Sequence, residues 1–192
     1  DCSYITIGRA GEFKLTAASI ACTDRELRPM RHAGRGGVGA VMGSKGIKAI
    51  VLDPAGTPVI RKPKNAEAFK AASRAFAQGL SSHPVCGTGL PTYGTNVLVN
   101  ILNEAGGLPT KNFSVGRFEG ADKICAETMV EIQKRRGGNP THGCHRGCIM
   151  KCSGICVDEN GEFVSKQPEY ETVWSHGAHC GVDDLDKIIL CD

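Results

Sequence analysis

The chain has 192 residues, with a hydrophobic content of 41%, a charged content of 22% and a formal net charge of +3. These values are typical of a globular protein of one or two domains. They argue against nucleic-acid binding, because the charge is small and dispersed, and against a membrane span, because no apolar run reaches about 18 residues. Ten cysteines without a visible signal peptide favour metal binding in a reducing, cytoplasmic compartment over disulfide bonds.

The first part of the chain predicts short strands around a glycine-rich segment. Residues 4–7 and 15–21 alternate weakly between apolar and polar types and predict strands around a turn at residues 9–12. Residues 34–46, GRGGVGAVMGSKG, predict a glycine-rich loop. The apolar run at residues 48–52 predicts a buried strand.

The glycine-rich loop suggests a ligand. Successive backbone N–H groups in such a loop form a concave anion-binding surface, and Arg35, Lys45 and Lys48 add positive charge. A phosphate-bearing cofactor is therefore expected here. Neither the P-loop pattern nor the dinucleotide-binding pattern fits the spacing, and a plain flexible turn is the alternative.

The second part of the chain predicts mainly helices. They are expected at residues 66–80, 95–104, 125–136 and 183–191, with Asn65 and Asp183 as N-caps. Residues 61–64 predict a linker, residues 82–94 a turn-rich segment and residues 108–113 an extended loop, and Asn160-Gly161 predicts the turn of a β-hairpin. The domains are expected at residues 1–62 and 63–192. Because the chain starts without Met and ends inside a predicted helix, we expect it to be a piece of a longer protein.

Residues 142–156, HGCHRGCIMKCSGIC, are the most informative stretch of the chain. They place Cys144, Cys148, Cys152 and Cys156 four residues apart, with glycines between them. Thiolates are the preferred ligands of iron–sulfur clusters and of zinc, and several ligands of a cluster often come from one short run. The spacing is unlike the paired C-x₂-C of a zinc ribbon. A structural cysteine stripe and a zinc site are the alternatives.

Several motifs together resemble the aldehyde:ferredoxin oxidoreductase family, the tungsten- or molybdenum-pterin enzymes. The motifs follow the family's order across nearly the whole chain. They are residues 7–12 (IGRAGE), residues 34–50 (GRGGVGAVMGSKGIKAI), Tyr93-Gly94-Thr95, residues 106–113 (GGLPTKNF), the cysteine run and residues 168–174 (PEYETVW).

The resemblance implies an α+β fold, in which the tail of a β-rich cofactor-binding domain precedes a mostly helical domain with an iron–sulfur cysteine loop. It also implies a bis-pyranopterin holding tungsten or molybdenum beside one [4Fe–4S] cluster. A Mg²⁺ ion at the pterin phosphates is left open. The implied activity is oxidation of a small aldehyde to a carboxylic acid, with electrons leaving through the cluster to ferredoxin or another carrier protein. This chain alone is expected to be inactive, and homo-oligomerisation is left open.

The resemblance also assigns roles to individual residues. It implies Cys144, Cys148 and Cys152 as cluster ligands, with Cys156 as a spare or substitute, although the first spacing is one residue longer than the family's common C-x₂-C. The residues implied to contact the cofactor are Arg35, Gly36, Gly37, Gly39, Ser44 and Lys45. The motif at residues 168–174 implies Glu171 as the catalytic base, with Glu169 second, and a buried position that raises the pKa of Glu171.

Two other functions stay open from the sequence. Some family members reduce an aromatic acyl-CoA ring, and the motifs do not decide between that substrate and an aldehyde. The second alternative is a cysteine-rich iron–sulfur module that binds or senses without catalysis. A cluster found without pterin would favour the module.

Overall fold

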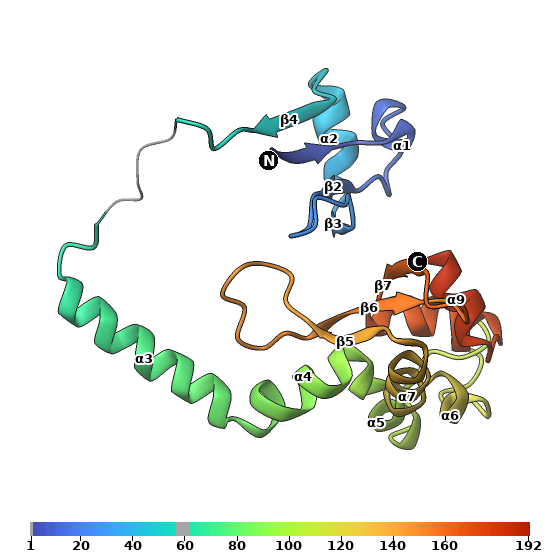
Figure 1. The fold of residues 1–192 in the computed structure, drawn as a ribbon. Coiled ribbons are helices and arrows are strands. Elements are labelled where there is room, and N and C mark those ends of the chain that lie inside the picture. Colours follow the sequence, from blue (N-terminus) through green and yellow to red (C-terminus); the bar gives the residue numbers. More distant parts are fainter. Residues whose placement is uncertain (1, 57–61) are drawn as a thin grey trace. The chain divides into compact units, whose positions relative to one another are not determined.

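The computed structural model describes residues 2–56 and 62–192. The described chain divides into two compact units, Asp1–Lys64 and Asn65–Asp192 (Figure 1). Each unit contains helices and an antiparallel sheet, which confirms the predicted α+β class. Part of the predicted linker at residues 61–64 lies outside the described residues, because residue 61 is not among them.

The first unit is built on a four-stranded sheet in the order β3-β2-β1-β4. Its strands are β1 (Ser3–Thr6), β2 (Ile20–Cys22), β3 (Arg31–Ala33) and β4 (Ala49–Leu52), and its helices are α1 (Arg9–Glu12) and α2 (Val38–Ser44). Ile5 of β1 lies opposite Cys22 on one side and Ile50 on the other.

The predicted strands of the first unit are confirmed only in part. Strand β1 starts one residue earlier than predicted, and of residues 15–21 only the last two belong to β2. The predicted turn at residues 9–12 is the short helix α1. Strand β4 exists, but its four residues are exposed rather than buried.

The predicted glycine-rich loop is wrong for residues 38–44, which form helix α2. Gly37 starts this helix with φ +64°, a left-handed conformation that glycine adopts without strain. A Cβ at Gly39 would collide with the carbonyl oxygen of Ser19, and a Cβ at Gly43 with that of Gly11. These glycines therefore let α2 lie directly against the chain that connects β1 to β2.

Replacing Gly39 by Ala should destabilise the first unit. The added methyl group meets backbone atoms of Ala18 and Ser19, which cannot move aside as a flexible side chain would. Overpacking of this kind costs about 1–3 kcal/mol, so thermal unfolding should start at a lower temperature. Gly34→Ala is the matched control, because a Cβ there meets nothing within 4 Å. Equal unfolding temperatures for the two variants would contradict this packing.

The second unit is mostly helical and carries the sheet β5-β6-β7. Its strands are β5 (Asn139–His142), β6 (Ser153–Val157) and β7 (Phe163–Lys166). Its α-helices are α3 (Ala66–Ser82), α4 (Leu90–Tyr93), α5 (Leu98–Glu104), α6 (Ala121–Ile124), α7 (Ala126–Arg136), α8 (Tyr170–Thr172) and α9 (Leu185–Cys191). Shorter helical turns are η1 (Pro84–Gly89), η2 (Gly94–Val97), η3 (Val173–Gly177) and η4 (Ala178–Cys180).

Most sequence predictions for this unit are confirmed. Asn65 caps α3 by accepting a hydrogen bond from the N–H of Ala68 at 2.9 Å, and the hairpin turns at Gly161 with φ +81°. The segment predicted as turn-rich, residues 82–94, is instead largely helical. The cap of α9 is Asp184 rather than Asp183, since its carboxylate accepts from the N–H groups of Asp186 and Lys187.

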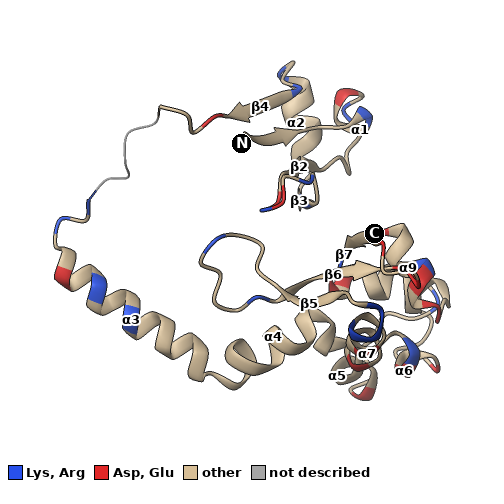
Figure 2. Cartoon of the chain, in the orientation of Figure 1, with Lys and Arg blue, Asp and Glu red and all other residues tan. Residues whose placement is uncertain are grey.

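A core between α5, α6, α7 and α9 holds the second unit together. Its fully buried members include Val99, Leu108, Ile124 and Met129, and Ile188 of α9 joins them. Arg136 at the end of α7 makes two parallel hydrogen bonds to Asp186 of α9, at 2.6 and 2.9 Å. The charged residues of both units are otherwise dispersed along the chain (Figure 2). Among the described residues, no helix has the length and apolar character needed to cross a membrane.

Candidate metal centre and active site

The cysteine run forms the loop between strands β5 and β6. His142 ends β5 and Ser153 begins β6, where the two residues lie opposite each other. The ten residues between them carry three cysteines, and Gly147, with φ +80°, lets the loop turn back. The hairpin therefore closes the loop at its base and brings the thiols toward one another.

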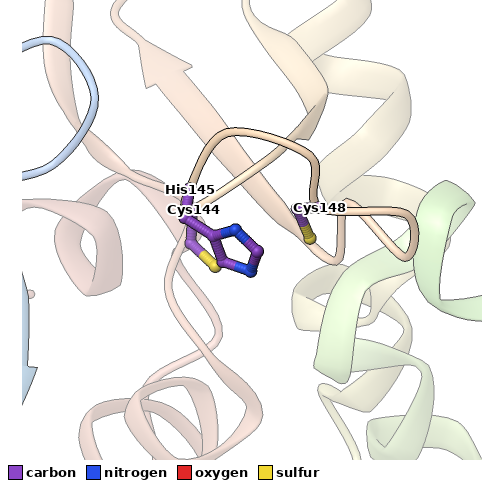
Figure 3. Close-up of side chains that lie close together, drawn as sticks. All are labelled: Cys144, His145 and Cys148. Carbon is purple, nitrogen blue, oxygen red and sulfur yellow. The ribbon is translucent and has the colours of Figure 1, made fainter. Parts of the chain in front are cut away.

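Two of the predicted ligands lie together within this loop. The ligand atoms of Cys144, His145 and Cys148 all lie within 4.8 Å of one another, and Figure 3 shows these three side chains. The N–H of Lys151 donates to Sγ of Cys148 at 3.4 Å. Amide hydrogen bonds to sulfur tune the reduction potential of iron–sulfur clusters, so this contact fits a thiolate ligand.

The third predicted ligand, Cys152, is half-buried at the start of β6. Burial raises the pKa of its thiol, and the negative charges of Glu169, Cys144 and Cys148 raise the pKa further. Among the described residues, the close group of ligand atoms holds Cys144, His145 and Cys148, and Cys152 lies outside it. A bound cation would reverse this rise in pKa, because it stabilises the thiolate form of every ligand. The donor set thus fits a soft, multiply charged metal centre.

Cys156 is different from the other three cysteines. It lies inside strand β6 opposite Ser165 and is fully buried. Burial raises the pKa of its thiol to about 12, so Cys156 stays a neutral thiol. It packs as a small apolar side chain, which favours the first of its two expected roles, a spare cysteine, over a substitute ligand.

The sequence reasoning missed His145 as a neighbour of the thiols. Its Nδ1 lies 2.9 Å from the backbone oxygen of Arg146. In histidines that bind metals, the second ring nitrogen commonly contacts a carbonyl in this way. The signal was available, because His145 directly follows Cys144 in the run.

The two glutamates of the predicted catalytic motif have different surroundings. Glu171, in helix α8, is exposed, so the expectation of a buried carboxylate is not met in the described chain. Glu169 is half-buried and accepts a hydrogen bond from Oγ1 of Thr95 at 2.6 Å. The choice of Glu171 as the base stays a prediction.

The six residues predicted to bind the pterin phosphates lie at different places on α2. Arg35 and Gly36 are exposed and precede the helix, whereas Ser44 and Lys45 are at its other end. At 1.5 Å per residue the two ends are about 10 Å apart. Ser44 uses its hydroxyl within the helix, donating to the carbonyl oxygen of Val41 at 2.7 Å.

The six residues therefore do not converge on one point of the described first unit, and their contact with the cofactor stays a prediction. Packing already explains why Gly37 and Gly39 are glycines. A Cβ at Gly37 would collide with the backbone carbonyl oxygen of Thr16, and a Cβ at Gly39 with that of Ser19. Arg35, Gly36 and Lys45 are the predicted residues that the packing leaves free for a ligand. Lys48 is occupied, since its ammonium contacts Glu12 and the backbone oxygen of Ile7, each at 2.5 Å.

The fold and the loop define a class: a two-unit α+β chain whose second unit carries a thiol-rich metal-binding loop. Comparison with known protein families identifies one family within that class. The model "Aldehyde ferredoxin oxidoreductase, N-terminal domain" matches residues 1–54, and the model "Aldehyde ferredoxin oxidoreductase, domains 2 & 3" matches residues 71–192. The chain belongs to the aldehyde ferredoxin oxidoreductase family.

Individual relatives agree with this assignment. The tungsten-containing aldehyde ferredoxin oxidoreductase of Pyrococcus furiosus is 41% identical over 192 residues, covering 97% of this chain and 29% of the relative. The enzyme of the same name from Thermococcus kodakarensis is 41% identical over 187 residues, covering 96% of this chain and 28% of the relative. The chain thus spans less than a third of the length of these relatives.

One solved structure shares the fold. It is the active-site complex BamBC of benzoyl coenzyme A reductase with 1,5-dienoyl-CoA, and it matches with a TM-score of 0.61 and 20% sequence identity. The match covers 98% of this chain and 28% of that chain. A likeness at this identity is informative about the fold alone.

Proposed function

We propose that the full-length protein is a tungsten-dependent enzyme that oxidises an aldehyde to a carboxylic acid. The observation that carries this proposal is the 41% identity to tungsten-containing aldehyde ferredoxin oxidoreductases over nearly the whole chain. The thiol loop supports it, because the ligand atoms of Cys144 and Cys148 lie within 4.8 Å of each other and Cys152 follows in the same loop. A bound tungsten bis-pterin would accept the two electrons that leave the aldehyde, and a [4Fe–4S] cluster would pass them one at a time to ferredoxin or another carrier.

Four residues of this chain have a defined part in the proposal. Cys144, Cys148 and Cys152 hold the cluster through thiolate sulfurs. Glu171 takes a proton from the water that attacks the aldehyde carbonyl, because formation of the acid releases protons as well as electrons. Glu171 is exposed, so its carboxylate is accessible to the attacking water.

The activity is tested directly on the full-length protein under anaerobic conditions. We expect acetaldehyde to reduce added ferredoxin, with acetate formed in proportion. If the protein contains tungsten and cluster but reduces ferredoxin with none of a series of small aldehydes, the proposed reaction is wrong. Reduction of an aromatic acyl-CoA ring is then the alternative activity to assay.

Arg35 is proposed to bind a phosphate of the pterin. It is exposed and directly precedes Gly36, whose φ of +79° turns the backbone ahead of α2. Arg35→Gln should therefore lower the pterin content of the purified full-length protein, measured by fluorescence after acid release. Arg25→Gln, which removes an exposed charge of the same unit outside the predicted set, is the matched control and should retain its pterin. Equal pterin contents for both variants and wild type would remove Arg35 from the site.

A second candidate function is a structural metal module without catalysis. The observation that favours it is the position of His145 beside Cys144 and Cys148. A mixed set of sulfur and nitrogen ligands is typical of zinc. In that case the purified full-length protein would contain zinc at this loop and neither iron nor tungsten.

A further inference from the structure

A short polar segment in the second unit holds Glu169 in place. The segment is Thr95-Asn96, at the start of η2. The hydroxyl of Thr95 donates to Oε2 of Glu169 at 2.6 Å and accepts from the N–H of Tyr170 at 3.0 Å. The side chain of Asn96 donates to the backbone oxygen of Pro168 at 2.6 Å. These three hydrogen bonds fix both the backbone of residues 168–170 and the direction of the Glu169 carboxylate.

Gly94, which directly precedes Thr95-Asn96, lies against Cys152. Gly94 adopts φ +63°, and a Cβ there would lie 2.8 Å from the backbone oxygen of Cys152 and 2.8 Å from Nε2 of Gln167. The N–H of Gln167 donates to the oxygen of Gly154 at 2.7 Å. Gly94 therefore lies against the end of the cysteine loop, and Gln167, two residues before Glu169, is bonded to the start of β6.

This arrangement places a carboxylate beside the proposed cluster. Glu169 is half-buried, so water screens its charge less than it screens the charge of an exposed side chain. The hydrogen bond from Thr95 holds the carboxylate in one position. The reduction potential of an iron–sulfur cluster depends on the net charge around it and on its exposure to solvent. A fixed negative charge disfavours reduction, because reduction adds another negative charge to the cluster.

We propose that Glu169, held by Thr95, lowers the reduction potential of the cluster bound by Cys144, Cys148 and Cys152. The proposal rests on the proposed function, since it requires a cluster in the loop. The cluster gains or loses one electron in each step, and no bond forms or breaks. Glu169 takes no part in bond making and acts only through its charge. Thr95 is a positioning residue, because it acts on the cluster through Glu169.

The experiment measures the midpoint potential of the cluster in the full-length protein by a redox titration followed by electron paramagnetic resonance. Glu169→Gln removes the charge and keeps the shape of the side chain. It should shift the potential upward by the equivalent of about a tenfold change in the ratio of oxidised to reduced cluster, which is about 59 mV for one electron.

Glu162→Gln is the matched control. Glu162 is exposed and directly precedes β7, five residues before Gln167. At about 3.4 Å per residue it lies roughly 17 Å along the strand from Gln167, beyond the Debye length of about 8–10 Å. The same loss of charge at this position should leave the potential unchanged.

The role of Thr95 is tested by combining variants. In a Thr95→Val background the carboxylate loses its hydrogen bond, so Glu169→Gln should shift the potential much less than it does in wild type. In a Thr95→Ser background the hydroxyl is restored, and the full shift should return. If Thr95 had a purely structural role, Thr95→Val and Thr95→Ser would change the stability of the protein. Glu169→Gln would then shift the potential equally in both backgrounds.

The outcomes separate the inference from the proposed function. If Glu169→Gln keeps the iron content and the potential moves as expected, the inference holds. If the iron content is normal and the potential stays at the wild-type value, or moves as much in Glu162→Gln, the inference is wrong and the proposed function is untouched. If wild type itself contains no cluster, the proposed function fails, and this inference fails with it.

Discussion

Replacing Cys148 by Ser should remove the cluster from the full-length protein. Cys148 has its ligand atom within 4.8 Å of that of Cys144 and accepts an amide hydrogen bond at its sulfur. A serine hydroxyl is not ionised at neutral pH and is a hard ligand, whereas iron–sulfur clusters require thiolates. Iron, acid-labile sulfide and visible absorption should all fall to a small fraction of wild type. The same loss is expected for Cys144→Ser and for Cys152→Ser.

Two controls come from the same stretch of sequence. Cys156→Ser alters a buried residue of β6 whose thiol has a pKa of about 12, so some stability should be lost but iron should remain. His145→Asn removes an imidazole and keeps all the thiols, so iron should also remain. The assignment is contradicted if Cys156→Ser loses the cluster while Cys144→Ser keeps it.

Replacing Glu171 by Gln should lower aldehyde turnover by roughly 10²–10⁴-fold, the usual contribution of one general base. The substitution keeps the size of the side chain and removes the oxygen that accepts the proton of the attacking water. Glu171 is exposed, so the change should leave the core intact. Tungsten, iron and the cluster spectrum should therefore match wild type, and the loss should be in kcat.

Glu169→Gln is the control for this effect. One oxygen of its carboxylate accepts the Thr95 hydroxyl and the side chain is half-buried, so the variant should cost much less turnover than Glu171→Gln. If both variants oxidise aldehyde at the wild-type rate, Glu171 has no catalytic role. The base then lies in a part of the protein that this chain does not include.

The second unit could be predicted well from the sequence because local signals agree with the final packing. The side chain of Asn65 caps α3 as expected, and helix α7 ends at the left-handed Gly137. Asn160-Gly161 turns the hairpin where the dipeptide indicated. Each of these features depends on a few neighbouring residues, which the sequence displays directly.

The glycine-rich segment could not be predicted in the same way. Glycine density is compatible with a ligand-binding loop and with a helix that packs closely on another backbone. Gly39 and Gly43 serve the second purpose, since they approach Ser19 and Gly11. Those partners are 20 or more residues away in the sequence, so only the tertiary structure reveals the reason for the glycines.

The candidate metal centre was predictable in its residue types and less so in its surroundings. The run of cysteines identified the thiols, whereas the burial of Cys156 depends on its place in β6. The contact between Thr95 and Glu169 joins residues 74 positions apart. No local pattern could have indicated that Glu169 rather than Glu171 faces the protein interior.

The metal content of the full-length protein, purified without oxygen, tests the central claim most directly. The account predicts about four iron atoms per chain with a similar amount of acid-labile sulfide, together with tungsten and pterin. Iron should be lost selectively in Cys144→Ser, Cys148→Ser and Cys152→Ser. Zinc in place of iron, with no tungsten or pterin, would contradict the account and would favour the structural metal module.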